Sequence, residues 1–183
     1  MFHIVFAGRL IERKGLKVLI EAVNLLREEN NNFKLHIFGE GSMLSDLQKA
    51  VTLNHAGKNI LIEGFKANIL DYLASAQLCV FPSLEGEGLM NVVLESMYYN
   101  GLVLTTHGNG NDEIITDGLD GFLIEPNNAQ ILKEKMLYVM NNFANLSQIK
   151  VNARRKIQCN FTWENHARKF DSICKKLIQE FRT

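Results

Sequence analysis

The sequence FHIVFAGRLIERKGLKVLIEAVNLLREE, residues 2–29, contains the pattern that decides the fold. Its first seven residues form an apolar run that ends at Gly8, which is typical of a buried strand. After a charged turn, apolar side chains recur at the spacing of one helix face over residues 15–29. The stretch therefore predicts a strand, a short turn and an amphipathic helix, in that order.

The same order of elements recurs along the rest of the chain. Further apolar runs, interpreted as strands, cover residues 33–39, 59–65, 78–83, 101–106 and 120–126. Helical patterns cover residues 15–29, 43–51, 68–76, 91–99, 129–143, 146–158 and 163–181, and Thr162 is the expected N-cap of the last helix. Short apolar strands that alternate with helices are typical of a parallel sheet covered on both sides. We therefore predict an α/β fold: a Rossmann-like parallel β-sheet with helices on both faces.

Length, composition and charge limit the class of protein. The 183 residues fit one domain, and 46% apolar residues are normal for a protein that forms a core. With no linker, repeat or low-complexity segment, we treat residues 1–183 as a single domain. The 20 Lys and Arg residues balance the 20 Asp and Glu residues. This balance argues against a nucleic-acid partner or a polybasic membrane anchor, because both require excess cations.

Neither the apolar runs nor the cysteines indicate a membrane or secreted protein. No apolar run approaches the roughly 20 residues of a transmembrane helix, and the N-terminus lacks the pattern of a signal peptide. Cys79, Cys159 and Cys174 fit no zinc spacing, and the five histidines show no metal-ligand spacing either. We therefore expect a cytoplasmic protein with reduced cysteines, no transmembrane segment, no metal and no cofactor.

In a sheet of this kind, ligands bind beyond the carboxyl ends of the strands. Gly8 ends the first strand, and glycine lets a backbone approach a ligand closely, although loops favour glycine in any case. Arg9 and Lys14 follow this glycine and flank the start of a helix. Two cations beside a helix N-terminus suit a phosphate or diphosphate. Ordinary surface cations in a solvated turn would produce the same pattern.

A second candidate site lies in PSLEGEGLMNVVLESM, residues 82–97. Glu87 and Glu95 are eight residues apart, so Glu95 lies about two turns along a helix that begins just after Gly88. A carboxylate in a cleft can accept hydrogen bonds from the vicinal hydroxyls of a ribose or a hexose. Alternatively, both glutamates are ordinary solvated charges of a helix. The backbone N–H groups that suit a phosphate belong to Gly88, Leu89, Met90 and Asn91.

Taken together, these motifs resemble a known family. The chain is similar to the C-terminal, donor-binding domain of the retaining glycosyltransferase family four, which has the GT-B fold. The resemblance covers residues 3–180, essentially the whole chain. The matching motifs are FAGRLIERKGLKVLIEA, IFGEGSMLSDL, EGEGLMNVVLESM with its Glu-x7-Glu spacing, EIITDGLDGFLIEP and FTWENHARKF. Each motif alone is modest, but all of them occur in the family's order.

The resemblance implies catalytic roles for three residues. Arg9 and Lys14 would hold the donor diphosphate and stabilise charge on the leaving group, and Glu87 would contact the transferred sugar. The family transfers a sugar from a nucleotide sugar to an acceptor hydroxyl, with retention of configuration and without a metal. The resemblance therefore implies a nucleotide-sugar donor, by default a UDP-sugar. It also implies a glycan or lipid-linked acceptor, as in polysaccharide or lipopolysaccharide assembly.

The resemblance also implies donor-binding roles for a wider set of residues. Glu95 would bind the ribose hydroxyls, and Phe65 and Lys66 would lie beside the base. The complete set of expected donor-binding residues is Gly8, Phe65, Lys66, Gly88, Leu89, Met90, Asn91 and Glu95. One departure concerns this set, because family members often have proline where Met90 stands.

The length of the chain departs from the family's pattern. Family members have two domains of similar size, with the active site between them. This chain begins where the first should end, so we expect the N-terminal acceptor domain to be absent. The chain alone would then bind donor but transfer sugar poorly. Any association with the inner face of the membrane would lie in the missing half.

Other functions remain compatible with parts of the pattern. One alternative is a non-catalytic nucleotide-sugar binding module or subunit. Another is a sugar-nucleotide epimerase or a phosphorylase with the GT-B fold, but those proteins lack the combined Arg/Lys and Glu-x7-Glu spacing. A signalling receiver, which is also doubly wound, needs acidic residues after the first strand, and Arg9 stands there instead.

Overall fold

The computed structural model describes residues 1–84, 88, 90–108 and 110–181. Over these residues the chain forms a six-stranded, wholly parallel sheet with the strand order β3-β2-β1-β4-β5-β6. The strands are β1 (Phe2–Ala7), β2 (Phe33–Phe38), β3 (Ile60–Gly64), β4 (Leu78–Phe81), β5 (Val103–Thr106) and β6 (Phe122–Ile124). The predicted α/β fold is therefore confirmed.

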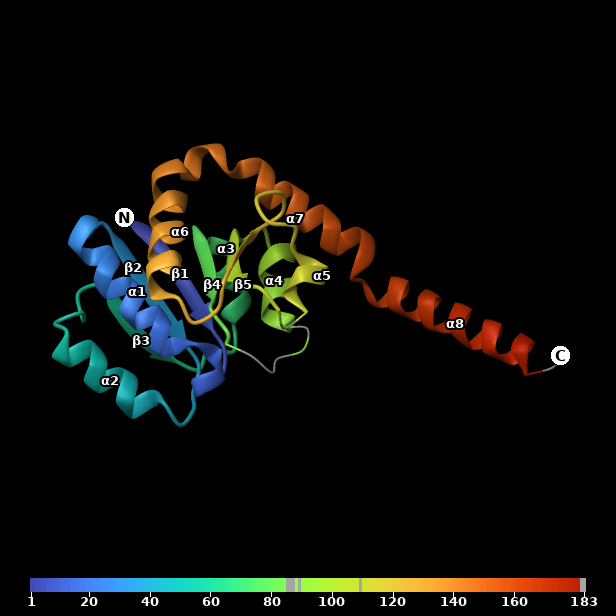
Figure 1. Ribbon diagram of the computed structural model, residues 1–183, viewed down its shortest axis with the longest axis horizontal. Helices are drawn as coiled ribbons and strands as arrows, with labels where there is room; N and C mark the ends of the chain where they lie inside the picture. The colour runs from blue at the N-terminus through green and yellow to red at the C-terminus, as the bar shows by residue number, and fades with distance from the viewer. Residues whose placement is uncertain (85–87, 89, 109, 182–183) are drawn as a thin grey trace.

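Helices connect the strands and cover both faces of the sheet. Figure 1 shows α1 and α6 in front of the sheet and α3 behind it. The helices are α1 (Leu16–Glu29), α2 (Leu44–Leu53), α3 (Ile69–Ser75), α4 (Asn91–Tyr98), α5 (Asn111–Ile114), α6 (Ala129–Asn142), α7 (Ser147–Asn160) and α8 (Trp163–Glu180). Two short 3-10 helices, η1 (Glu12–Lys14) and η2 (Phe143–Asn145), complete the described elements.

The strong patterns of the sequence become the elements they predict. Every predicted strand and helix is present, with boundaries that differ by at most two residues. The short helices η1 and α5 were not predicted, because three or four residues are too few to show a helical period. Every residue of β4 and β5 is buried, and burying one large apolar side chain stabilises the fold by about 1.5–3 kcal/mol. The continuous apolar runs thus reflect strands covered on both faces.

The last helix, α8, differs from the others in its packing. Figure 1 shows it extending away from the sheet, and none of its residues is buried. The side chain of Thr162 accepts a hydrogen bond from the Asn165 N–H over 3.2 Å, so the predicted N-cap is confirmed. Its large exposed apolar side chains recur at helical spacing and give it an amphipathic face. They are Trp163, Phe170, Ile173, Leu177 and Ile178.

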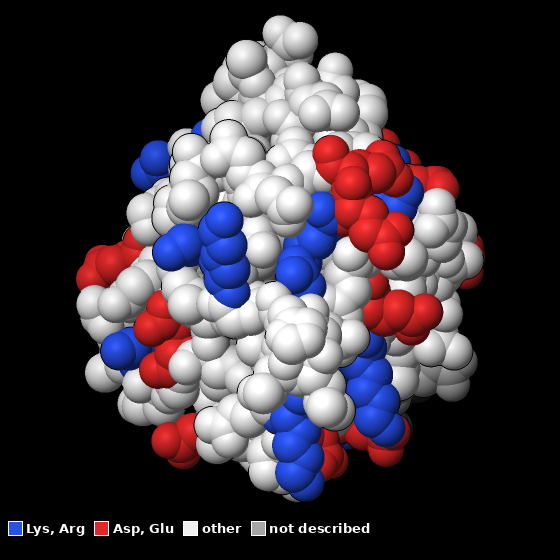
Figure 2. Space-filling view, turned by 90° about the vertical axis from the view of Figure 1, so that its left-hand side faces the viewer, with Lys and Arg blue, Asp and Glu red and all other residues white. Residues whose placement is uncertain are grey.

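Charged side chains of both signs lie on one side of the molecular surface. Figure 2 shows the side where α1 and α2 lie, with cationic and anionic side chains both present and neither sign covering the face. This mixture agrees with the balanced charge of the sequence.

Within the residues described, no helix combines the length and the apolar character that a membrane span requires.

Candidate functional site

A pocket with a volume of about 650 Å³ lies at the carboxyl edge of the sheet. Its walls come from the ends of β1, β2 and β3 and from the starts of α3 and α4. From β1 the chain adds β2 and β3 on one side of the sheet and then β4, β5 and β6 on the other side. The strand order therefore reverses between β1 and β4, which is where the pocket lies. Ligands of open α/β sheets bind at such a reversal, and the volume suits a small molecule.

The turn after β1 is fixed by backbone contacts with the turn after β2. The Leu10 N–H donates to the Glu40 carbonyl oxygen over 2.8 Å, and the Met43 N–H donates to the Leu10 carbonyl oxygen over 2.9 Å. A Cβ atom on Gly39 would lie only 1.9 Å from the Gly8 carbonyl oxygen. Strand-end glycines were expected to let backbone approach a ligand. At Gly39, however, glycine admits the backbone of the neighbouring turn.

Arg9 and Lys14 reach the pocket from the two ends of the β1 turn. Lys14 is the last residue of η1, and Gly15, with a left-handed φ of 69°, leads from it into α1. A Cβ atom on Gly15 would lie 1.8 Å from the Pro82 carbonyl oxygen, so the backbone of this turn packs directly against the residues after β4. Among the described residues, no hydrogen bond or ion pair involves the Arg9 guanidinium. The turn therefore brings two cations to one wall, as a phosphate site requires.

The start of α4 forms another wall of the pocket. Met90 is the N-cap residue, with an extended backbone, and its side chain makes no capping hydrogen bond. Asn91 and Val92 follow it and line the pocket. The first N–H groups of a helix lack intrahelical partners and carry partial positive charge. An anion between this wall and the two cations would meet positive charge from both sides.

Apolar side chains form the part of the pocket beside β2 and β3. Phe38 is buried and packs against Tyr72, with ring centroids 4.5 Å apart. Phe65 lies just beyond β3 and is 70% exposed. An aromatic ring at the edge of a pocket suits stacking on a flat ligand ring. Lys66 and Ile69 continue this wall toward α3.

The structure brings most of the predicted site residues together. The predicted residues that line the pocket are Gly8, Arg9, Lys14, Phe65, Lys66, Met90 and Asn91. Gly88 is exposed and does not line it. Glu95 is exposed on α4 and does not line the pocket, although it lies one turn beyond the lining residues Asn91 and Val92 on the same side of the helix. Glu87 and Leu89 lie outside the described residues.

Several lining residues were not predicted from the sequence. Phe38 is the last residue of β2 and was predicted only as part of a strand, whereas Gly39 and Glu40 follow it at a strand end where a ligand was expected. Ala7, Ile69 and Val92 carry no such signal, because their small or apolar side chains look like ordinary core residues. Apolar walls of a pocket and a protein core have the same composition, so the sequence alone does not separate them.

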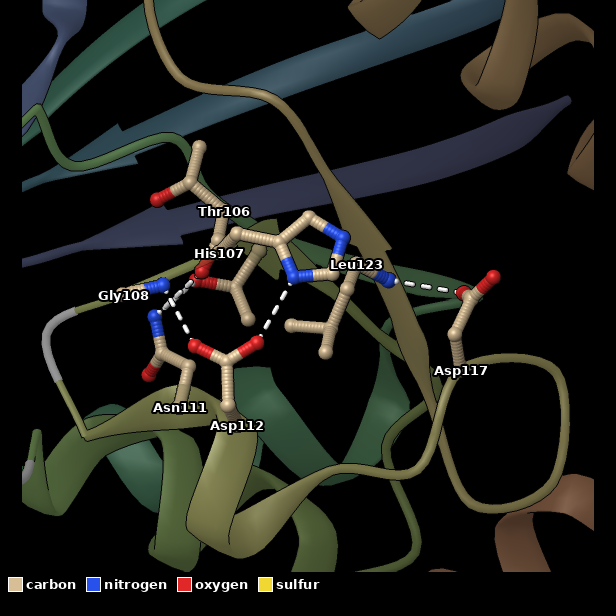
Figure 3. Close-up of polar contacts among 8 residues, drawn as sticks. Thr106, His107, Gly108, Asn111, Asp112, Asp117 and Leu123 are labelled. Carbon is tan, nitrogen blue, oxygen red and sulfur yellow. Dashed lines mark hydrogen bonds and ion pairs between the residues drawn. The ribbon is translucent and has the colours of Figure 1, made fainter.

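The turn after β5 contains a second polar cluster, shown in Figure 3. His107 Nδ1 lies 2.7 Å from Asp112 Oδ1, and the Gly108 N–H donates to Asp112 Oδ2 over 2.5 Å. The hydrogen bond with His107, followed by that from Gly108, lowers the pKa of Asp112 below its ordinary value. Asn111 donates to the Thr106 carbonyl oxygen over 2.8 Å. The cluster does not line the pocket, and the spacing of His107 and Asp112 gave no sign of it.

A metal site requires several ligating side chains that face one point. Across the part of the chain that the structure describes, no group of three or more His, Cys, Asp or Glu side chains is placed to hold a metal ion. Cys79 is buried in β4, and burial raises the pKa of its thiol to about 12.

The sequence matches a known family and known proteins. The family model described as "Glycosyl transferases group 1" matches residues 2–156. The amylovoran biosynthesis glycosyltransferase AmsK of Erwinia amylovora is 28% identical over 182 residues, which are 96% of this chain and 45% of AmsK. The chain therefore spans about half the length of this relative.

Solved structures show the same fold. A mutant of Staphylococcus aureus TarM, in complex with fondaparinux, alpha-GlcNAc-glycerol and UDP, is 25% identical. It superimposes with a TM-score of 0.83 over 99% of this chain and 35% of TarM. The C-terminal domain of the group 1 family protein LpcC from Francisella tularensis is 24% identical. It has a TM-score of 0.79 and covers 88% of this chain and 87% of that domain.

Proposed function

Because the chain belongs to the glycosyl transferases group 1, we propose that it is the donor-binding part of a retaining, metal-independent glycosyltransferase. It would bind a nucleotide sugar whose sugar is transferred to an acceptor hydroxyl. The single observation that carries the proposal is the pocket at the sheet reversal, where two cations, a helix start and an exposed aromatic ring converge. Each of these features matches one part of a nucleotide sugar.

The diphosphate is assigned to the wall made by Arg9, Lys14 and the start of α4. A leaving nucleoside diphosphate gains negative charge as the glycosidic bond breaks. Fixed positive groups aimed at this charge lower the barrier, because they need no reorganisation during the reaction. Cationic side chains and the helix start would supply that stabilisation in the absence of a metal.

The base is assigned to the wall beyond β3, and the ribose is assigned to the side of α4. The base would stack beside Phe65 and Lys66, and the ribose hydroxyls would bind Glu95 on α4. A uridine nucleotide is the first candidate, since the related TarM was crystallised with UDP. Glu87, the residue expected to contact the transferred sugar, lies outside the described residues.

The acceptor site is assigned to a part of the enzyme outside this chain. AmsK, which is named for amylovoran biosynthesis, is matched over only 45% of its length. We propose that a second domain completes the active site and that a glycan or lipid-linked acceptor binds there. The chain alone should then bind the donor without efficient transfer.

Calorimetric titration of the chain with UDP, GDP and ADP tests this function. We expect one nucleotide to bind, and Arg9→Ala to weaken its binding by about tenfold to a hundredfold, since hydrogen bonds to charged groups contribute about 1.5–3 kcal/mol. Arg155→Ala is the matched control, because Arg155 is exposed on α7, away from the pocket. Absence of binding to all three nucleotides would reject the function, as would an equal loss in both variants.

A further inference from the structure

The thioether of Met90 connects the start of α4 with one of the two pocket cations. Met90 is 4% exposed, and its Sδ lies 3.8 Å from Lys14 Nζ. Both residues line the pocket. A buried, uncharged sulfur atom therefore contacts a cation to which the proposed function assigns the donor diphosphate.

A second contact fixes the position of this sulfur. The Ser83 hydroxyl donates to Met90 Sδ over 3.3 Å, and Ser83 is 1% exposed. The Ser83 carbonyl oxygen in turn accepts a hydrogen bond from Thr106 Oγ1 over 2.6 Å. Thr106 is the buried last residue of β5. A continuous series of contacts thus runs from β5 through Ser83 and Met90 to Lys14.

The backbone at Met90 does not explain why a methionine stands there. Its φ of −85° and ψ of 109° are ordinary extended values that most residues adopt. The N-cap position favours a small polar side chain that bonds to the helix, and Met90 makes no such bond. Instead of capping the helix, its side chain contacts Ser83 and Lys14.

We propose that Met90 is a positioning residue, whose thioether holds the Lys14 ammonium toward the donor diphosphate. A lysine side chain has many rotamers, and a fixed neighbour reduces the freedom that it loses on binding a ligand. A thioether is a weak acceptor without formal charge. It therefore orients the ammonium without competing with a phosphate for its charge, as a carboxylate would. This inference rests on the proposed function.

A double-mutant cycle tests the inference. Dissociation constants for UDP and for inorganic pyrophosphate are measured with the wild type, Met90→Leu, Lys14→Ala and the double variant. Leucine has a similar volume but no acceptor. We expect Met90→Leu to weaken both ligands by roughly threefold to tenfold, the range of one modest hydrogen bond. In the Lys14→Ala background the same change should have no further effect, because the ammonium that Met90 would position is gone.

Two further variants separate positioning from packing. Met97→Leu is the matched control, because Met97 is 0% exposed on the same helix and does not line the pocket. Its ligand affinities should equal those of the wild type. Met90→Gln supplies an amide oxygen as an acceptor and should recover part of the lost affinity. A merely structural role of Met90 would not produce this recovery.

The outcomes distinguish the inference from the function on which it rests. Equal losses for Met90→Leu with and without Lys14 would show that Met90 only shapes the pocket, and would overturn the inference. Wild-type affinity in Met90→Leu would overturn it as well. If the wild type itself binds neither pyrophosphate nor any of UDP, GDP and ADP, the proposed function fails, and the inference fails with it.

Discussion

Two turns at the same edge of the sheet are stabilised in different ways. The turn after β1 is held by backbone contacts, in which Gly15 and Gly39 admit neighbouring carbonyl groups at distances that exclude a side chain. The turn after β5 is held by its own polar side chains, chiefly by His107 and Asp112, as Figure 3 shows.

This difference suggests how the two turns divide their roles. Where backbone packing fixes a turn, a charged side chain such as that of Arg9, which makes no hydrogen bond or ion pair with other described residues, can be used to bind a ligand. Where side chains fix a turn, those side chains serve the fold. We therefore expect changes at Arg9 to affect binding and changes at Asp112 to affect stability.

The largest effect should come from Gly39→Ala. The added Cβ would meet the Gly8 carbonyl oxygen, and the φ of 136° is unfavourable for alanine. We expect a loss of about 2–4 kcal/mol in the free energy of unfolding, measured by urea denaturation. Gly57→Ala is the control, because no atom lies near its Cβ position. Equal stability of the two variants would show that the β1 turn is not held by close backbone packing.

A smaller effect, confined to binding, is expected for Phe65→Ala. The ring is 70% exposed, so its removal should leave the free energy of unfolding within about 0.5 kcal/mol of the wild type. Loss of stacking on a base should weaken nucleotide binding by about 1–2 kcal/mol, which calorimetry can measure. Phe170→Ala, which removes a ring that is 64% exposed on α8, should change neither quantity. Unchanged nucleotide binding in Phe65→Ala would place the base elsewhere.

The smallest effect is expected for Asp112→Asn in the β5 turn. The carboxylate is half exposed, so we expect a loss of about 0.5–1 kcal/mol in the free energy of unfolding at pH 7. Nucleotide binding should not change, because Asp112 does not line the pocket. A loss of binding without a loss of stability would contradict the division of roles between the two turns.

The same variant has an expected pH dependence. Folding lowers the pKa of Asp112, chiefly through the hydrogen bond with His107, so the unfolded chain binds the proton more readily. The stabilisation is therefore present above the ordinary Asp pKa of about 3.9 and is lost as the pH falls through the lower folded value. Denaturation curves at neutral and acidic pH should show the wild type and Asp112→Asn converging in acid. A constant difference would exclude the carboxylate as its source.

Much of the fold could be predicted because its signals are local. The apolar runs of buried parallel strands and the helical spacing between them determine the elements one segment at a time. Arg9 and Lys14 were expected at a ligand site because they follow a strand at the edge where ligands bind, and the resemblance to the family added Phe65 and Met90. Arg9 and Lys14 follow β1, Phe65 follows β3 and Met90 follows β4, so their convergence in one pocket depends on the strand order.

The remaining features depend on distances that no local pattern encodes. Nothing in the sequence shows that Gly39 packs against Gly8, or that His107 turns back to Asp112. Phe38 looked like a core residue, and it is both buried and part of the pocket wall. In each case, which residues make contact depends on how two turns or two layers of the fold pack together. That packing is defined only once the whole sheet is assembled.

The central claim is that the pocket at the sheet reversal binds the donor nucleotide. A crystal structure of the chain with UDP tests it most directly. We expect the diphosphate within hydrogen-bonding distance of Arg9 and Lys14, and the uracil beside Phe65. UDP bound at another site, or bound in this pocket with its diphosphate away from both cations, would contradict the account.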